Sequence, residues 1–468
     1  MSQRGTIIKS GFWYTVSNYL IKGLDFLTIP IFARILSVSE YGAYNNFVSC
    51  LQLFYVMGSI CIDASFISAR FDYKNELKKY TKNALISANI CTIILIGVSI
   101  VFYGGIQSLF NIDGFMLFFI ILYCLFRPSL DVFQQIERFN YNYKKCVFVS
   151  SLVSISSVVF SLLLVNCSPN RLDARIIGTY IPIIVISLYF YFSYLWNDFS
   201  FEREQIKYAF KICLPYVPHS LAIMVLASSD RIMINYFHDS SQVAYYSIAY
   251  TCGIALSVLA NSLNNAFVPW LGDRINEGKV EIINRTSKWY ILVFYLPLLF
   301  IVTFSPEVLY VLGGKQYSEA MYVMPPVLIS CFIQFIYSLF VDVEQLEKKT
   351  KGMALASVIA AVVNIILNYI YVPSFGYIAA AYTTLISYVC LMLFHWFIIK
   401  RIGYSKAYNI KFIFALIIIM TLYVICISTL YYSLWIRGLI CLIVVLIALV
   451  IGIKQKEKII CYIKKKGF

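Results

Sequence analysis

Residues 411–430 read KFIFALIIIMTLYVICISTL, and after Lys411 this stretch contains no charged side chain. An α-helix needs about 20 consecutive apolar residues to cross the ~30 Å hydrocarbon core of a bilayer. The stretch therefore predicts a membrane-spanning helix. Closed β-barrels also span membranes, but their strands alternate polar and apolar residues over about 10 positions, which this continuous run does not do.

Stretches of the same kind recur along the whole chain, which is 468 residues long, 60% hydrophobic and only 13% charged. Soluble domains are about 45–50% apolar and about 25% charged, so the composition excludes a soluble enzyme, a disordered chain and a secreted disulfide scaffold. The sequence predicts an all-α polytopic membrane protein with about fourteen transmembrane helices. We expect these spans near residues 11–33, 43–66, 84–104, 114–134, 147–166, 176–196, 212–237, 243–270, 289–312, 320–343, 353–373, 376–399, 411–430 and 434–453.

The formal net charge of +15 follows the connections between the spans. Most of the 38 Lys and Arg residues fall in alternate loops and in the tail, as in the groups 78–82 and 464–466. The opposite loops hold few, among them Arg175 and Arg437. Because basic loops stay in the cytoplasm, this asymmetry places both termini there. The charge is explained as a topology signal, and we expect no nucleic-acid partner.

No motif indicates a cofactor, a metal or a catalytic centre. The 13 cysteines are scattered without a CxxC pair, and Gly313-Gly314-Lys315-Gln316 lacks the spacing and hydroxyl of a phosphate-binding loop. The three histidines are far apart in the sequence. We therefore expect no cofactor, no metal and no enzymatic activity.

Polar side chains inside the expected spans are the candidates for a binding site, because a charge at the centre of a membrane helix is costly and usually faces a cavity. Asn18, Lys22 and Asp25 share one face of their helix, Arg127 and Asp131 are one turn apart, and Asp230 is next to Arg231, so that these two point in different directions and need separate partners. The complete set is Asn18, Lys22, Asp25, Arg127, Asp131, Asp230, Arg231, Asn261 and Asn364.

Two interpretations of these residues stay open. In the first, Lys22, Arg127 and Arg231 line a hydrated central cavity and meet an anionic group, for which phosphate is the natural guest. In the second, each cation is neutralised by an Asp close to it in the sequence and only fixes helix packing. The asparagines of spans 243–270 and 353–373 serve either as cavity lining or as interhelical hydrogen bonds.

The two halves of the chain resemble each other weakly. Residues 39–44, SEYGAY, follow the first expected span, and residues 241–246, SQVAYY, follow the seventh. Six spans separate them, so the halves share an orientation in a parallel repeat. We expect a six-helix lobe over 1–205, a second over 206–402, and two further helices with a basic cytoplasmic tail over 403–468.

Several stretches together resemble the polysaccharide-biosynthesis flippases (Wzx-type) of the multidrug/oligosaccharidyl-lipid/polysaccharide (MOP) exporter superfamily. They follow in the expected order between residues 5 and 400, and Ala244 stands where that family usually has glycine. The principal ones are Arg34-Ile-Leu-Ser-Val-Ser-Glu-Tyr-Gly-Ala-Tyr44, Leu214-Pro-Tyr-Val-Pro-His219, Ser229-Asp-Arg-Ile-Met-Ile234, Val243-Ala-Tyr-Tyr-Ser-Ile-Ala-Tyr250 and Gly376-Tyr-Ile-Ala-Ala-Ala-Tyr382.

The resemblance implies two six-helix lobes in a V-shaped arrangement like that of the MATE exporters, with an additional C-terminal helix pair. It also implies a multi-pass protein of the bacterial cytoplasmic membrane. Its expected activity is translocation of an undecaprenyl-diphosphate-linked oligosaccharide to the outer leaflet, for assembly of O-antigen, capsule or exopolysaccharide. The expected partners are that lipid, membrane lipids, and the polysaccharide polymerase and export machinery. On matching positions, the resemblance indicates Lys22 and Arg231 as cavity cations.

For the mechanism we expect alternating access, with Asp25 or Asp131 carrying a proton or sodium site that couples transport to an ion gradient. A drug/cation antiporter of the same fold is the closest alternative, but it favours unpaired acidic residues. A membrane polysaccharide polymerase is a further alternative. It needs a sizeable outer loop with catalytic charges, and the longest outer loops expected here have about 10 residues.

Overall fold

The computed structural model of the protein describes residues 23, 26–140, 142–196, 201–347, 349–444 and 446. Within these residues the fold is all α, with short 3₁₀ segments. The helices are α2 (Val38–Ser59), η1 (Ile62–Ser65), α3 (Phe66–Asp72), α4 (Leu77–Val101), α5 (Tyr103–Phe110), α6 (Gly114–Phe139), α7 (Tyr143–Cys167), α8 (Arg171–Leu195), α9 (Arg203–Cys213), α10 (Val217–Phe237), α11 (Ser240–Asn276), α12 (Val280–Thr303), α13 (Ser305–Gly313), η2 (Lys315–Tyr322), α14 (Met324–Leu346), α15 (Thr350–Arg401) and α16 (Ile410–Thr429). Two shorter apolar helices cover Phe26–Ile35 and Leu434–Val444.

The length and composition of these helices confirm the prediction of a polytopic membrane protein. Among the described residues, ten helices are long and apolar enough to cross a membrane, or eleven if the bent pair of α2 with residues 62–72 forms one span; this count takes α15 as one helix. The number fourteen stays a prediction, because the first and last expected spans lie partly outside the described residues.

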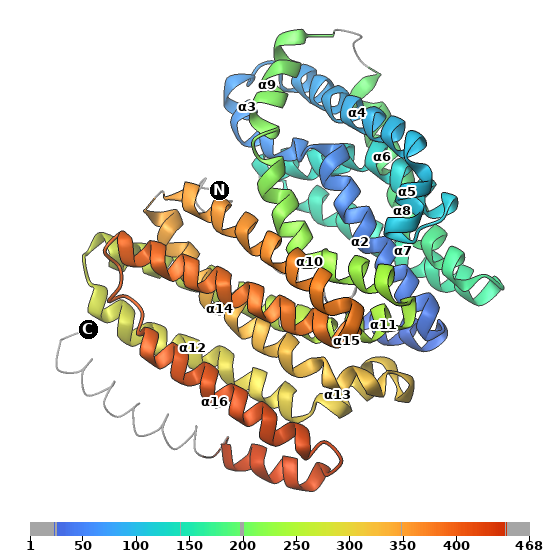
Figure 1. Cartoon of the computed structure of the whole chain (residues 1–468). Coiled ribbons are helices and arrows are strands. Elements are labelled where there is room, and N and C mark those ends of the chain that lie inside the picture. Colours follow the sequence, from blue (N-terminus) through green and yellow to red (C-terminus); the bar gives the residue numbers. More distant parts are fainter. Residues whose placement is uncertain are drawn as a thin grey trace.

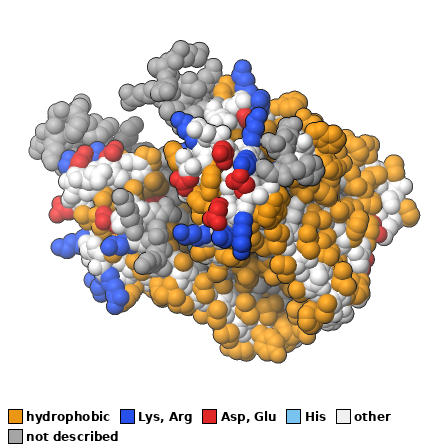
Figure 2. Space-filling model, turned by 90° about the horizontal axis from the view of Figure 1, so that it is seen from above, with side chains coloured by type: hydrophobic (Ala, Val, Ile, Leu, Met, Phe, Trp, Pro, Cys, Tyr) orange, Lys and Arg blue, Asp and Glu red, His pale blue; other side chains and the backbone are white. Residues whose placement is uncertain are grey.

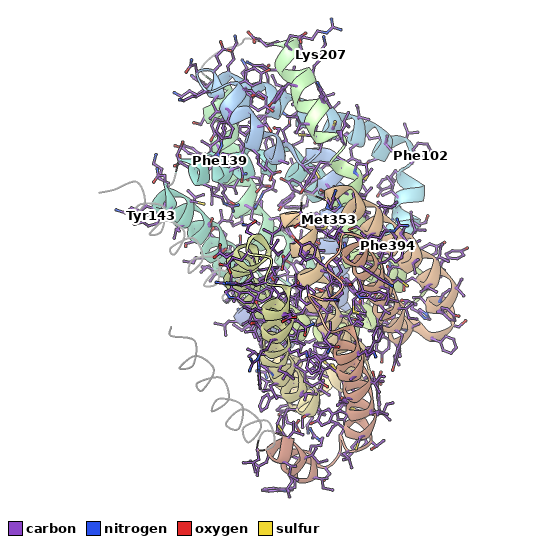
Figure 3. All side chains as sticks on the ribbon, turned by 90° about the vertical axis from the view of Figure 1, so that its left-hand side faces the viewer. Phe102, Phe139, Tyr143, Lys207, Met353 and Phe394 are labelled. Atoms are coloured by element: carbon purple, nitrogen blue, oxygen red, sulfur yellow. The ribbon has the colours of Figure 1, made fainter. Side chains whose placement is uncertain are left out.

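Helix α15 contains two of the expected spans, which meet in a hairpin at Gly376. This glycine has φ +59° and ψ −145°, a backbone conformation that side chains with a Cβ rarely adopt. Asn368 accepts a hydrogen bond from Thr383, and a Cβ at Gly352 would meet the Ile398 side chain. Residues at similar distances from the turn therefore touch. Met353 and Phe394, labelled in Figure 3, belong to the first and the second arm. The expected spans 353–373 and 376–399 are thus two antiparallel arms.

The helices form two groups, with α10 and α11 between them (Figure 1). Helices α2 to α9 occupy one side of the molecule, and α12 to α16 occupy the other. The expected boundaries at 205/206 and 402/403 remain predictions. Seen from the end where α9 lies, acidic and basic side chains lie over the middle and the left of the view, and hydrophobic side chains cover the right flank (Figure 2). Two ion pairs, Lys207–Glu204 and Lys79–Glu202, belong to this end.

The two repeated turns begin helices that pack against each other. Ser37 caps α2 in a capping box with Glu40, and Asp239 caps α11 by accepting a hydrogen bond from the Gln242 amide at 2.9 Å. A Cβ on Gly42 would lie only 1.6 Å from the carbonyl oxygen of Ser240. The first repeat needs glycine at this position because the start of α11 passes directly over it.

Replacing Gly42 with alanine should therefore destabilise the protein. The added methyl group must push α2 away from α11, and overpacking of this kind costs about 1–3 kcal/mol or more. We expect the detergent-solubilised variant to lose several degrees of melting temperature. Gly97→Ala in α4 is the matched control, because a Cβ there meets no atom within 4 Å and alanine favours a helix. An unchanged melting temperature for Gly42→Ala would contradict the close contact.

Candidate functional site

A cavity of about 550 Å³ lies among the Phe26–Ile35 helix, α2, α6, α7 and α8. We call it the N-terminal chamber. Two arginines line it, Arg127 from α6 and Arg175 from α8, together with many hydroxyl and amide groups. The polar lining consists of Thr28, Tyr44, Asn45, Arg127, Gln134, Ser150, Ser154, Ser157, Arg175, Thr179 and Tyr180.

Arg127 carries a carboxylate partner. Its Nε and one terminal nitrogen lie 2.9 Å and 2.8 Å from Oδ1 of Asp131, one helical turn further along α6. Asp131 also accepts a hydrogen bond from the Tyr55 hydroxyl. Both side chains keep about a fifth of their surface exposed, 20% for Arg127 and 23% for Asp131. The pair is therefore anchored but still reaches the chamber.

Arg175 lies in the second turn of α8 and not in an outer loop, so the sequence-based placement was wrong for this residue. Its guanidinium carbon lies 3.3 Å from the ring centre of Phe32 and 4.9 Å from that of Tyr44. Its buried Nε has no hydrogen-bond partner, and no carboxylate pairs with it among the described residues. Stacking on aromatic rings holds the guanidinium but leaves its donors free for an anion.

A smaller cavity of about 130 Å³ adjoins the N-terminal chamber and shares Ile29, Tyr44, Asn45 and Arg175 with it. We call it the central chamber. Its opposite wall comes from α10 and α11, which contribute Arg231, Ser247, Thr251 and Ile254. The two adjoining chambers are thus lined by three arginines from three different helices.

Arg231 is held without an acidic partner among the described residues. Its Nε donates to the Ser247 hydroxyl at 3.1 Å, and one terminal nitrogen donates to the Ala227 carbonyl at 3.1 Å. The guanidinium carbon lies 4.9 Å from the ring centre of Tyr250 and 5.7 Å from that of Tyr246. Because the remaining terminal nitrogen has no such partner in the described part of the chain, Arg231 can also bind an anion.

Asp230 points away from the chambers into a buried polar cluster. Its side chain is 1% exposed and accepts hydrogen bonds from Asn368 at 2.6 Å, Thr384 at 2.5 Å, Asn364 at 3.3 Å and the Tyr246 hydroxyl. The Ser229 hydroxyl donates to Asn364 at 2.8 Å. The neighbours Asp230 and Arg231 therefore do have separate partners, and they serve different sites.

The Asp230 cluster depends on the α15 hairpin. Asn364 and Asn368 come from the first arm, and Thr383 and Thr384 come from the second. Their amide and hydroxyl oxygens, together with the carboxylate, make up a set of oxygen ligands such as a hard cation prefers. Rotation of the two amides would turn their oxygens toward the carboxylate. The cluster is chemically suited to take up a small cation or a proton.

A third cavity, of about 120 Å³, lies between α11, α12 and α14 and contains Asn261. We call it the amide notch. No charged residue lines it among those described. The two asparagines predicted as cavity lining therefore have different surroundings. Asn364 is fully buried beside Asp230, whereas Asn261 is exposed.

Of the other predicted site residues, Arg127 and Arg231 line the adjoining chambers, and Asp131 is paired with Arg127. Asn18, Lys22 and Asp25 lie outside the described residues. Sequence reasoning missed Arg175, Tyr246 and Thr384 as site residues. Asn368 is one of the asparagines that the sequence indicates in span 353–373, one helical turn after Asn364. Across the described residues, no group of three His, Cys, Asp or Glu side chains could hold a metal ion.

Comparison with known proteins gives two matching family models. The model described as "Polysaccharide biosynthesis protein" matches residues 7–274. The model described as MatE matches residues 215–370. The first covers all three arginines of the chambers. The second covers Arg231, the amide notch and the Asp230 cluster except for Thr383 and Thr384.

Individual relatives have low sequence identity, but their alignments cover most of both chains. A protein of the Lsg locus of Haemophilus influenzae is 22% identical over 369 residues, which are 77% of this chain and 90% of that protein. The probable low-salt glycan biosynthesis flippase Agl15 of Haloferax volcanii is 22% identical over 81% of this chain and 80% of its own length. Among solved structures, the lipid II flippase MurJ in an inward closed conformation aligns with a TM-score of 0.68 at 15% identity, covering 91% of this chain and 99% of that one.

Proposed function

The chain belongs to the polysaccharide biosynthesis protein family, and on that premise we propose that it moves an undecaprenyl-diphosphate-linked oligosaccharide from the cytoplasmic to the outer leaflet of a bacterial cell membrane. Family and fold indicate a multi-pass transporter rather than an enzyme. The relative named as a glycan biosynthesis flippase supports the same class of activity. Delivery to a polymerase and export machinery, for O-antigen, capsule or exopolysaccharide, is part of the proposal.

One observation supports this substrate above all. Arg127, Arg175 and Arg231 line two adjoining chambers, and only Arg127 has a carboxylate partner among the described residues. An unpaired cation within a membrane protein is costly and marks a functional site. A diphosphate offers several oxygens with delocalised negative charge, which the planar guanidinium groups bind through paired hydrogen bonds. The surrounding hydroxyl and amide groups suit the first sugar beside it.

The drug/cation antiporter is the second candidate, since the MatE model matches part of the chain. A cationic drug requires exposed acidic or aromatic groups. The chambers present guanidinium groups instead, and these already cover the rings of Phe32, Tyr44 and Tyr250. Repulsion between like charges makes the anionic lipid the better substrate.

For the coupling ion we propose the Asp230 cluster in place of Asp25 or Asp131. The charge of Asp131 is already neutralised by the Arg127 guanidinium, whereas no cationic side chain pairs with Asp230 among the described residues. Asp25 lies outside the described residues. A sodium ion or a proton entering as co-substrate would neutralise the Asp230 carboxylate inside a cluster built from both α15 arms and α10. Alternating access then follows if α10 moves with the hairpin between two states.

Complementation tests the proposed activity. In a bacterium whose own repeat-unit flippase has been deleted, the wild-type chain should restore surface polysaccharide. Arg127→Ala should lower that rescue at least about tenfold, because one charge-assisted contact is worth about 1.5–3 kcal/mol. Arg203→Ala, at the exposed start of α9, is the control and should rescue fully. Full rescue by Arg127→Ala would show that this residue does not belong to the binding site. If the wild-type chain fails to rescue but confers drug resistance, the antiporter is favoured.

A further inference from the structure

The amide notch is a second polar site that the arginine chambers and the Asp230 cluster do not explain. It is lined by Ser257 and Asn261 from α11, Gln334, Tyr337 and Ser338 from α14, and the Phe294 ring of α12. The amides of Asn261 and Gln334 have no hydrogen-bond partner in the part of the chain that the structure describes. Nearby, Oδ1 of Asn264 and Oδ2 of Asp342 are buried and also without a partner there. Buried acceptors of this kind call for a hydrogen-bond donor.

The side chains of α14 show that the notch is an opening rather than a packing defect. Most side chains of α14 are buried, yet Gln334, Tyr337 and Ser338 are half-buried and lie on the same helical face. All three carry polar groups. A polar face on an otherwise buried membrane helix indicates contact with water or a polar ligand, since lipid would leave those groups unsatisfied.

The notch lies on the same helical face as the central chamber. Ser247, Thr251 and Ile254 of α11 line that chamber, and Ser257, Asn261 and Asn264 continue at the same spacing into the notch. At 1.5 Å per residue, Asn261 lies about 15 Å beyond Thr251 along the helix. A ligand anchored by a charged group at Arg231 and extending along α11 would therefore reach the notch with a part that is polar but uncharged.

We propose that the amide notch is a saccharide subsite, in which Asn261, Gln334 and Ser338 bind hydroxyl groups at the edge of a sugar ring. Each primary amide offers donors and an acceptor, which matches a sugar hydroxyl, and no charged residue of the described lining competes. The half-buried ring of Tyr337 stacks on Tyr388 and His395 and supplies a rigid flat side for the apolar face of a sugar. A volume of about 120 Å³ admits the edge of one ring, while the rest of the glycan stays outside.

This inference rests on the proposed function and is tested by separating the sugar from the lipid diphosphate. The probes are radiolabelled undecaprenyl diphosphate and the same lipid carrying the oligosaccharide repeat of the complementing bacterium, both bound to the full chain in nanodiscs. Wild type should bind the sugar-bearing lipid more tightly. Asn261→Ala and Gln334→Ala should each weaken that binding about two- to tenfold, the effect of one lost hydrogen bond. Affinity for undecaprenyl diphosphate should not change, which also reports correct folding.

Asn265→Ala is the matched control, because Asn265 is an exposed amide of the same helix outside the notch. Equal affinity of wild type for both lipids would overturn the subsite, as would equal weakening of both lipids by Asn261→Ala or the same effect from Asn265→Ala. Failure of wild type to bind undecaprenyl diphosphate at all would instead overturn the proposed function.

Discussion

Replacing both Arg175 and Arg231 with alanine should abolish rescue of the flippase-deleted bacterium and weaken binding of undecaprenyl diphosphate at least about a hundredfold. Each guanidinium contributes charge-assisted hydrogen bonds worth about 1.5–3 kcal/mol, and neither arginine has a described carboxylate to absorb its charge. Equilibrium binding of the radiolabelled lipid in nanodiscs measures the change. We expect Arg175→Lys and Arg231→Lys to keep part of the affinity, because lysine retains the positive charge but lacks the planar guanidinium group.

The thermal stability of the double alanine variant separates binding from folding. Arg175 and Arg231 are stacked on rings and leave donors unused, so their removal deletes uncompensated charge from the protein interior. The melting temperature should stay the same or rise. Arg171→Ala serves as a control on the same helix, since Arg171 is exposed and donates to the Ile35 carbonyl outside both chambers. A double variant that binds the lipid as tightly as wild type would contradict the proposed role of the two arginines in binding the diphosphate.

Replacing Asp230 with asparagine should remove the ion dependence of transport. The wild-type carboxylate is 1% exposed and surrounded by amide and hydroxyl groups, so a bound sodium ion or proton would stabilise the folded protein. At a free ion concentration about 100 times the dissociation constant, ion binding adds about 2.7 kcal/mol to the free energy of unfolding. This raises the melting temperature by several degrees. A sodium titration at fixed pH and a pH titration at fixed sodium identify the ion. For a proton, stability should fall as pH rises.

Asp239→Asn is the matched control for this substitution. Asp239 caps α11 by accepting from the Gln242 amide, and asparagine caps equally well, so the ion response should be retained. If Asp230→Asn keeps the wild-type response to both sodium and pH, coupling does not pass through this cluster.

The sequence predicts the fold class well because hydrophobic length is a local property. The all-α class, the approximate positions of the apolar spans and the two turns that precede α2 and α11 follow from residues close together in the chain. The hairpin of α15 is also visible locally, since Pro373 and Gly376 interrupt an apolar run that is too long for one crossing. The Arg127–Asp131 pair likewise follows from one-turn spacing on a single helix.

The two chambers and the Asp230 cluster cannot be predicted in this way, because their residues come from helices that are distant in the sequence. Arg175 follows an outer turn and has the composition of a loop residue, and only its packing on Phe32 and Tyr44 places it in a cavity. Arg437 was also expected in an outer loop, but it is 1% exposed and paired with Glu307 at 2.7 Å. Asn261 and Asn364 are the same residue type in similar surroundings, yet one faces open space and the other binds Asp230.

The most direct test of the account is translocation by the purified chain in proteoliposomes. The labelled sugar-bearing undecaprenyl diphosphate starts in one leaflet, and its appearance in the other is followed with a membrane-impermeant sugar-oxidising reagent. We expect vesicles with wild type to expose the lipid faster than protein-free vesicles. A gradient of the ion that binds the Asp230 cluster should raise this rate further. The Arg175→Ala/Arg231→Ala variant should be no faster than protein-free vesicles. A wild-type rate equal to that of protein-free vesicles, or a double variant as fast as wild type, would contradict an arginine-lined path for a lipid diphosphate.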